Sequence, residues 1–380
     1  MSDVALISCT SYDEVEVLAA VERGVSLLGG ADKFVQPGEK ILLKLNWLSA
    51  DPPEKCVTTH PAVFRAVATV FQRAGAQLSY GDSPGFQPPE TAAKKTGAAE
   101  VADQLGIPLG DFRAGQEIHF PEGRQNKRFM ISNAVLESDG VISLPKMKTH
   151  AFQRVTGAVK NQFGCIPGAL KGEFHVKIPS AYDFAKMLID LNAFVRPRLF
   201  VMDGVMAMEG NGPRGGDPRK MNVLLFSTDP IALDATMCRL MNLDPALVLT
   251  NRAGAEQGLG TYRSEEINLH GDHIENFIAK DYVVNREPEQ ETAKRARPGF
   301  LKEALTPKPY IVEEKCVRCG ICVQMCPVTP KVVNWHDGNK KNPPSYQYDR
   351  CIRCYCCQEV CPESAIFVKV PLLRKILDRK

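Results

Sequence analysis

Residues 316–327 read CVRCGICVQMCP, and residues 351–362 read CIRCYCCQEVCP. Each stretch spaces four cysteines by two, two and three intervening residues and follows the last one with proline. The chain has 13 cysteines, and those outside this region are Cys9, Cys56, Cys165 and Cys238. The clustered cysteines decide the fold of the C-terminal part of the chain, because whatever they bind must hold their loops together.

The repeated spacing indicates metal–sulfur binding rather than disulfide bonding. An odd number of cysteines in a long chain without a visible export signal argues against a disulfide framework. The run C-x2-C-x2-C-x3-C-P, given twice, is the pattern by which bacterial ferredoxins hold two 4Fe–4S clusters, whereas zinc sites rarely repeat it. The fourth cysteine of each run ligates the cluster of the other run. We therefore predict two ligand sets, which are Cys316, Cys319, Cys322 and Cys361 for one cluster and Cys351, Cys354, Cys357 and Cys326 for the other. We interpret the surplus Cys356 as a bystander beside a ligand.

Composition narrows the class of protein. The 380 residues are 44% hydrophobic and 24% charged, as in soluble chains, and suggest two or three domains at about 100–200 residues each. No apolar run approaches the roughly 20 residues that a membrane span needs, and the first residues lack the features of a secretory signal. The formal net charge of +3 is too small to indicate nucleic-acid binding, and it falls to about −1 once eight thiolates and two oxidised clusters are counted. We expect a cytoplasmic protein without a membrane span or a nucleic-acid partner.

Residues 1–280 alternate short β-rich apolar runs with helical patterns, which is typical of a parallel sheet covered by helices. Helical spacing predicts one helix behind a cap at Thr58 and Thr59 and another behind Ser180. The predicted fold class is α/β, with an open, mostly parallel sheet flanked by helices and a small C-terminal α+β dicluster ferredoxin-like domain. The predicted strands cover residues 4–8, 41–45, 77–80, 140–144, 199–202 and 223–226.

Changes of composition divide the chain into four parts. Residues 1–280 form the α/β body, and the polar, charged and proline-bearing residues 281–310 form a linker. Residues 311–370 form the dicluster domain. Residues 371–380 form a basic tail, which we interpret as part of an amphipathic helix packed on the body rather than on a membrane.

Polar residues follow nearly every predicted strand. In open α/β sheets, ligands bind outside the carboxyl ends of the strands, so parallel strands would bring these residues to one edge. The alternative is that the acidic ones only cap the next turn or helix. We favour capping for Asp229, because Pro230 follows it at a first helical position. The residues concerned are Asn46, Asp82, Ser83, Lys146, Asp203 and Asp229.

The most unusual segment is residues 145–177, PKMKTHAFQRVTGAVKNQFGCIPGALKGEFHVK. Basic residues outnumber the single acid, Glu173, and glycines are interleaved with them. Glycines permit close backbone approach and lysines supply positive charge, so we predict an anionic-ligand site, with a solvated surface as the alternative. His150 and His175 are candidates for general acid or proton relay, with ordinary hydrogen-bonded histidines as the alternative. The candidate catalytic residues are Lys146, Lys148, His150, Lys160 and His175. Cys165 is either a reactive thiol or, as is commoner, a buried inert one.

A second glycine-rich stretch, MEGNGPRGG at residues 208–216, surrounds Arg214 with glycines. Backbone amides in such a loop can cradle an anion, although a mobile loop is the alternative. The stretch matches neither of the two glycine-rich nucleotide-binding motifs, and the sequence lacks the usual hydrolase and kinase motifs. The candidate substrate-binding residues of the whole body are Asn46, Asp82, Asn161, Arg214, Gly210 and Gly212.

Six motifs together resemble the domain-of-unknown-function 362 family over nearly the whole chain. They are KLNWL at 44–48, TTHP at 58–61, GDSPG at 81–85, LPKMKTH at 144–150, TGAVKNQFGCIPG at 156–168 and MDGVMAMEGNGPRGG at 202–216. The resemblance implies an α/β body with a tethered dicluster domain. It implies no settled activity, but it favours the KMKTH, KNQFG and EGNGP segments as parts of the site.

We expect an iron–sulfur redox enzyme, a reductase in which two 4Fe–4S clusters relay electrons from a soluble low-potential donor such as ferredoxin to an anionic small molecule in the body. Lysines and Arg214 would hold the anion, and His150 or His175 would supply a proton. Two alternatives stay open. One is a non-redox enzyme or anion-binding protein with regulatory or structural clusters, and the other is an electron carrier or maturation partner for another enzyme.

Overall fold

The computed structural model describes residues 1–168, 170–288 and 306–371. Most of the predicted linker (281–310) and nearly all of the predicted tail (371–380) lie outside the described residues. Within the described ranges, no helix is long and apolar enough to cross a membrane.

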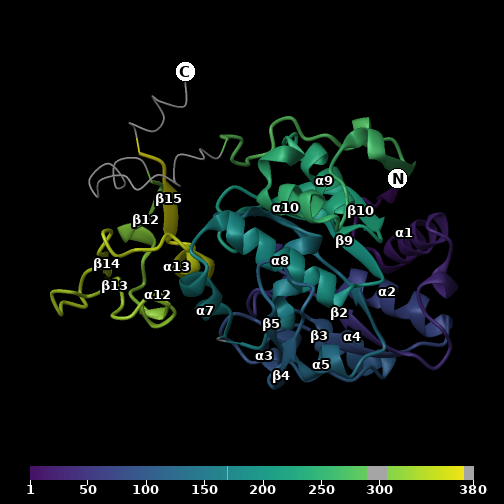
Figure 1. Ribbon diagram of the computed structural model, residues 1–380, viewed down its shortest axis with the longest axis horizontal. Coiled ribbons are helices and arrows are strands. Elements are labelled where there is room, and N and C mark those ends of the chain that lie inside the picture. The colour runs from purple at the N-terminus through teal and green to yellow at the C-terminus, as the bar shows by residue number, and fades with distance from the viewer. Residues whose placement is uncertain (169, 289–305, 372–380) are drawn as a thin grey trace.

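A mixed sheet forms the centre of the body, in the order β11–β1–β10–β9–β6–β2–β3 (Figure 1). Four of its strands run in the same direction along one side. β2 (Lys40–Lys44) pairs in parallel with β3 (Gln77–Gly81) and with β6 (Gly140–Ser143), and β6 pairs in parallel with β9 (Leu199–Glu209). The carboxyl ends of these strands therefore lie at a common edge, as the sequence predicts.

The rest of the sheet contains the antiparallel pairs. β10 (Asp217–Ser227) runs antiparallel to β9 and to β1 (Ser2–Ser8), and β11 (Ile267–Gly271) pairs in parallel with β1. β7 (Lys146–His150) pairs in parallel with β9 and antiparallel with β8 (Arg154–Thr156). Parallel pairings are the majority in this sheet, so the predicted α/β class is confirmed.

Helices cover both faces of the sheet because successive strand residues point to opposite faces. Ile41 and Leu43 of β2 belong to the core beneath α1 and α2, whereas Leu42 between them belongs to the core beneath α8 and α10. Both cores consist of fully buried aliphatic and aromatic side chains. The helices of the body are α1 (Glu14–Leu27), α2 (Pro61–Arg73), α3 (Pro89–Lys95), α4 (Ala98–Leu105), α5 (Asn133–Leu136), α6 (Ala158–Asn161), α7 (Leu170–Lys177), α8 (Ala181–Val195), α9 (Pro230–Leu240) and α10 (Leu249–Gln257). A separate hairpin joins β4 (Gly115–His119) to β5 (Arg128–Ser132).

One local expectation needs correction, and two others are confirmed. Asp229 does not share the common edge, because β10 runs antiparallel and carries it to the opposite edge. There its carboxylate caps α9, accepting from Ile231 N and Ala232 N at 2.8 and 3.0 Å, as we favoured. The cap of α2 is His60 rather than Thr58 or Thr59, since the Thr59 hydroxyl instead donates to Leu144 O. Ser180 caps α8 as predicted.

The C-terminal module is a small α+β unit that lies beside α7 and α8 in Figure 1. Its sheet ladders are β12 (Lys308–Ile311) with β15 (Ile366–Lys369) and β13 (Val333–Asn334) with β14 (Ser345–Tyr346), both antiparallel. Two short helices, α12 (Ile321–Gln324) and α13 (Cys356–Glu359), each begin within a cysteine run. Cysteines and a few aliphatic side chains make up its core.

Hydrogen bonds from the loop after β9 hold this module against the body. The amide of Gln358 donates to Asn211 O at 2.8 Å and to Gly212 O at 3.1 Å. Arg214, itself paired with Asp51 at 2.8 Å, donates to Val360 O at 2.8 Å. The α13 end of the module is therefore fixed to the body by buried polar contacts.

One buried ammonium ties the carboxyl ends of the central strands together. Lys44, at the end of β2, is fully buried, and its Nζ lies 2.7 Å from Asp82 Oδ1, just beyond β3. The same Nζ donates to Leu45 O at 2.9 Å and to Asn161 O at 3.0 Å, at the end of α6. A Cβ at Gly164 would lie 1.9 Å from Asp82 Oδ1, so only glycine lets the loop after α6 pass this pair.

Replacing Lys44 with alanine should destabilise the folded protein by about 3–5 kcal/mol, because removing one partner leaves a buried carboxylate without its counter-charge. The measurement is the shift in the urea unfolding midpoint of the full-length, cluster-loaded protein.

The matched control is Arg73→Ala. Arg73 pairs with Glu22 at the surface, where both side chains are about half exposed or more, and such pairs contribute less than about 1 kcal/mol. Equal shifts for the two variants would show that the Lys44 pair does not hold the strand ends together.

Candidate functional site

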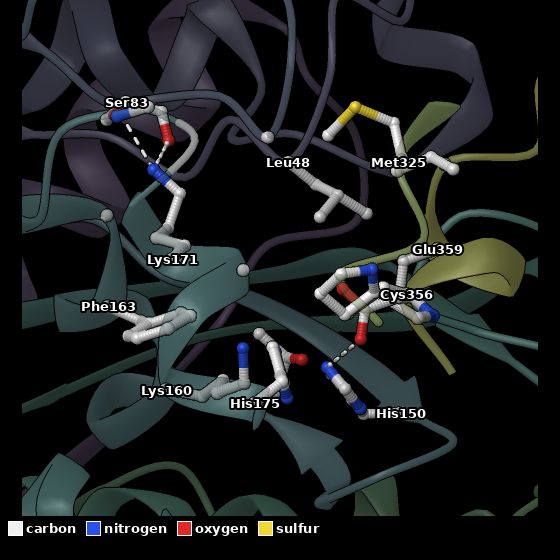
Figure 2. A pocket seen from close by; sticks show the side chains of 18 of the residues that line it. Leu48, Ser83, His150, Lys160, Phe163, Lys171, His175, Met325, Cys356 and Glu359 are labelled. Atoms are coloured by element: carbon white, nitrogen blue, oxygen red, sulfur yellow. Dashed lines mark hydrogen bonds and ion pairs between the residues drawn. The ribbon is translucent and has the colours of Figure 1, made fainter. Parts of the chain in front are cut away.

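A cavity of about 480 Å³ lies at the common edge of the sheet, between the body and the C-terminal module (Figure 2). The body contributes the residues that follow β2 and β3, the ends of β7 and β8, the α6 segment and α7. The module contributes residues 324–327, Lys331 and α13 with Val360. The cavity is within the size range of small-molecule sites, which is about 300–1,000 Å³.

Side-chain hydrogen bonds connect residues at the ends of the strands to α6 and so fix one wall of the cavity. The Asn46 amide donates to Asn161 Oδ1 at 3.0 Å, which joins the residue after β2 to α6. Asn161 Nδ2 in turn donates to Ser143 Oγ at 3.0 Å, at the end of β6. Asp234 fixes the start of α6 by accepting from Ala158 N at 2.6 Å. These contacts hold Asn46 and Asn161 at the cavity, and the ion pair with Lys44 holds Asp82 there, so three predicted substrate-binding residues line it.

Five of the described lysines line the cavity, which are Lys148, Lys160, Lys171, Lys177 and Lys331. Lys148 is 1% exposed, and its Nζ donates to Val57 O at 2.5 Å. Burial, together with the positive charges of Lys146 and Lys160, lowers the pKa of Lys148 to about 7. Lys171 donates to Ser83 Oγ at 2.8 Å and to two carbonyl oxygens, and burial lowers its pKa to about 7.

Lys160 is the lysine best placed to bind an anion. Its Nζ lies 4.8 Å from the centre of the Phe163 ring, and within the described ranges it has no hydrogen-bond partner. Burial lowers the pKa of Lys160, and the nearby carboxylate of Glu359 opposes this shift. A bound anion would supply the missing partner.

The two candidate histidines also line the cavity, and both are neutral near pH 7. Burial holds the pKa of His150 well below its ordinary value and lowers that of His175 to about 3. His150 Nδ1 accepts from Phe152 N at 3.0 Å, so the ring proton sits on Nε2, which lies 3.2 Å from Glu359 Oε1. His175 stacks on Phe184 with ring centres 4.5 Å apart. Neither ring is therefore an imidazolium that could donate a proton.

Several buried polar atoms around the cavity have no partner. Buried polar groups in folded proteins are nearly always hydrogen-bonded, so a group of exceptions needs an explanation. Within the described part of the chain, no hydrogen bond reaches Asn46 Oδ1, Trp47 Nε1, Thr156 Oγ1 or His175 Nδ1. All four belong to residues that line this one cavity, which indicates a ligand that pairs with them.

The module brings cysteines to the same cavity. Cys326, a predicted ligand of the second cluster, lines it, and so do the surplus Cys356 and the carboxylate of Glu359 on α13. Figure 2 shows Cys356 and Glu359 facing His150 across the boundary between module and body. The predicted redox centre and the basic segment therefore border one space.

The first predicted ligand set comes together in the structure. A second, smaller cavity in the module is lined by Cys316, Cys319, Cys322 and Cys361. Three of these cysteines come from one run and the fourth from the other, as the ferredoxin pattern requires. The residues present therefore fit a 4Fe–4S cluster.

The second set is built on an equivalent loop. Arg353 and Tyr355 have positive φ, as do Arg318 and Gly320 at the matching positions of the first run. Burial and the nearby charges of Cys354 and Cys351 raise the pKa of Cys357. The Tyr346 hydroxyl, whose oxygen lies 3.4 Å from the Cys357 sulfur, lowers this pKa by donating a hydrogen bond. Cys326 packs in the same small core as Cys357 and Cys351. Three of the four predicted thiols of the second set therefore lie in one core.

Other predicted site residues lie outside the large cavity. Lys146 is buried against Asp203, with Nζ 2.7 Å from Oδ2, and also donates to Tyr12 OH. Arg214 and Gly212 bind the module, and Gly210 N donates to Val283 O at 2.8 Å. The cavity therefore gives no support to a catalytic role for Lys146 or to a substrate-binding role for Arg214, Gly210 and Gly212.

The thiol of Cys165 is fully buried, and burial raises its pKa to about 12, so it corresponds to the inert alternative.

Sequence reasoning missed several residues of the cavity. Lys171 lies in the basic segment 145–177 and Trp47 in the KLNWL motif, and membership of these two segments is the signal that could have found them. Glu359 and Met325 carried no signal, because they lie inside the cysteine runs and reach the cavity only through the docking of the module.

Comparisons with known proteins agree with this architecture. A family model described as a domain of unknown function, DUF362, matches residues 41–239, and a model of a 4Fe-4S dicluster domain matches residues 308–362. A thylakoid-associated protein of Synechocystis sp. is 36% identical over 266 residues, which are 70% of this chain and 82% of that protein.

Among solved structures, the lactate racemase apoprotein from Thermoanaerobacterium thermosaccharolyticum is similar with a TM-score of 0.41 and 13% identity. The match covers 62% of this chain and 56% of the racemase chain. The family model and the Synechocystis relative together establish the membership: this chain belongs to the DUF362 family and carries a C-terminal 4Fe–4S dicluster domain.

Proposed function

We propose that this protein is an iron–sulfur reductase that passes electrons from a soluble low-potential donor, such as a ferredoxin, to an anionic small molecule bound in the large cavity. One observation carries the proposal. Lys148 and Lys160 of the body line the same cavity as Cys326, a predicted ligand of the nearer cluster.

Two 4Fe–4S clusters would be held by the two predicted sets of four cysteines. When bound, such clusters supply electrons one at a time. Cys319 of the first set is exposed, whereas Cys326 of the second set is buried at the cavity. This difference in exposure favours entry of electrons from a protein donor near Cys319 and transfer of electrons to the bound anion near Cys326.

The body would bind the anion and supply protons. Among the described residues the Lys160 ammonium has no hydrogen-bond partner, and Lys148 adds a second charge nearby. A two-electron reduction of one unsaturated bond also consumes two protons. A lysine with a pKa near 7 can donate one of them at neutral pH and regain it from solvent water, which also supplies the second proton. The neutral His150 and His175 can only accept a proton or orient the ligand. We therefore assign the proton-donor role to Lys148 instead of the histidines.

A cytoplasmic location stays part of this proposal, whereas the Synechocystis relative is named for its association with thylakoids.

Replacing Lys160 with methionine should weaken substrate binding roughly 10- to 100-fold, because a hydrogen bond to a charged group contributes about 1.5–3 kcal/mol. The assay reduces the air-excluded protein with a ferredoxin-type donor. It then follows the rate at which added organic anions restore the visible absorbance of the oxidised clusters.

The control is Lys95→Met, at the exposed end of α3, which should leave the rate unchanged. Both variants should keep about eight irons per chain, the number in two 4Fe–4S clusters. If no anion speeds re-oxidation although anions bind, the protein is a binding protein rather than a reductase. If a protein acceptor alone speeds it, the protein is an electron carrier.

Anion binding should weaken as the pH rises above about 7. In the free site, the charges of Lys146 and Lys160 and burial lower the pKa of Lys148 to about 7, against the attraction of Asp82 and Glu359. A bound anion favours the protonated amine and so raises this pKa. Below pH 7 Lys148 is protonated in both states, but above it binding requires proton uptake.

Calorimetry in buffers of different ionisation enthalpy should thus detect proton uptake on binding at pH 8 and little at pH 6. Affinity that increases with pH would contradict the assignment of Lys148 to the anion site.

Replacing Tyr346 with phenylalanine should lower the reduction potential of the second cluster. The Tyr346 hydroxyl donates to Cys357 Sγ at 3.4 Å, and a donor to a ligand sulfur stabilises the more negative, reduced state. The expected shift is roughly 20–60 mV, the one-electron equivalent of about 0.5–1.5 kcal/mol.

Redox titration followed by electron paramagnetic resonance measures this shift. Tyr348→Phe is the matched control, because Tyr348 stacks on Tyr346 but donates to Pro309 O. If both variants have the same potentials as the parent protein, the Tyr346 contact does not tune a cluster.

A further inference from the structure

We propose that the ligand of the large cavity is an organic acid with an extended apolar body, bound across the boundary between body and module. This inference rests on the proposed function for the location of the site, and it goes further by naming the substrate class. It excludes the small inorganic oxyanions, which the basic segment alone would equally suit.

The first argument is size. A cavity of about 480 Å³ is comparable to those that hold organic ligands of drug size. A phosphate, sulfate or nitrate ion beside Lys160 would fill a small part of it. The remaining volume would hold water against the apolar wall, which is unfavourable.

The second argument is the division of the lining into a charged side and an apolar side. Figure 2 shows Lys160 and His175 on one side of the cavity and Leu48 and Met325 on the opposite side. The module extends the apolar side with Pro327 and Val360. A ligand that satisfies both sides needs a carboxylate at one end and an apolar group at the other.

The third argument is the set of unpaired polar atoms. Trp47 Nε1 is a donor in a residue that is 1% exposed, and Thr156 Oγ1 is in a residue that is 5% exposed. Both lie in the lining but have no hydrogen-bond partner among the described residues. A carboxylate has two oxygens with about four acceptor positions, so it can pair with Lys160 and with one of these donors at once.

This division also explains why the site spans two parts of the chain. The body supplies the buried lysines Lys148 and Lys160 and the unpaired donors of Trp47 and Thr156, whereas the apolar side chains of Met325 and Val360 come from the module. The apolar end of the ligand is thereby placed on the side of Cys326, where the predicted second cluster lies. A ligand that joins the buried lysines to this apolar side is therefore elongated.

The test is isothermal titration calorimetry of the full-length, cluster-loaded protein with straight-chain carboxylates from acetate to octanoate. Each added methylene should tighten binding roughly threefold to fourfold until the cavity is filled. Octanol tests the need for the charge, and inorganic phosphate and sulfate test the alternative class. We expect one site per chain, weak binding of octanol and no binding of the inorganic ions.

Two variants separate the two sides of the cavity. Met325→Ala should reduce the gain per methylene, whereas Lys160→Met should remove the preference for octanoate over octanol. Val317→Ala, in the same module but 60% exposed, is the control for Met325→Ala. If Met325→Ala loses iron because Cys326 is adjacent, Leu48→Ala on the body tests the same apolar side.

The outcomes distinguish this inference from the proposed function. Phosphate or sulfate binding as tightly as octanoate, or affinity independent of chain length, would overturn the ligand class, even if such ions re-oxidise the reduced protein. Carboxylates that bind with the expected dependence on length, but never re-oxidise the protein, would support the ligand class and reject the reductase.

Discussion

The ammonium of Lys44 is the contact on which the site depends. It is fully buried and binds the carboxylate of Asp82 and the carbonyl oxygens of Leu45 and Asn161, so one cation joins the ends of β2 and β3 to α6. A buried charge is costly unless it is paired and its hydrogen bonds are satisfied. Here the Asp82 carboxylate pairs the charge, and the two carbonyl oxygens accept the other hydrogen bonds. The loop after α6 passes close by because Gly164 has no side chain. Lys160 belongs to α6, so the core of the sheet, rather than a surface loop, fixes its position.

The second constraint is the docking of the C-terminal module. Gln358, Arg214 and Asn211 make the polar contacts that hold α13 on the loop after β9. Through them Cys326 and Glu359 become part of a wall that the body alone does not complete. The glycine-rich loop that we predicted to cradle an anion instead receives the module. Its glycines serve close approach, since a Cβ at Gly212 would lie 2.3 Å from Thr149 O and one at Gly215 would lie 2.8 Å from Ser364 Cβ.

Burial also changes the pKa values of the cavity residues, and so it changes which of them can act as an acid. Histidine is the usual acid or base near neutral pH, but burial, together with the positive charge of Lys160, lowers the pKa of both cavity histidines and keeps them neutral. The same burial lowers the pKa of Lys148 into the range where a proton can be donated and recovered. Residue identity selects the candidates for a catalytic role, and their desolvation decides which of them can perform it.

The sequence by itself determined the α/β fold class, the C-terminal 4Fe–4S dicluster domain and several segments that line the cavity, and it predicted the individual cysteine ligands. These properties depend on neighbours close in the chain: the spacing of Cys316, Cys319 and Cys322, the periodicity of Val63, Val67 and Val70, and the polar residues at the ends of strands. Only the tertiary structure decided that Lys160 lines the cavity while Lys146 is neutralised by Asp203, and that Glu359 and Met325 complete the wall. The reason is that a local pattern indicates which face of a helix or strand a side chain occupies. Ion pairing and desolvation depend on residues far away in the sequence.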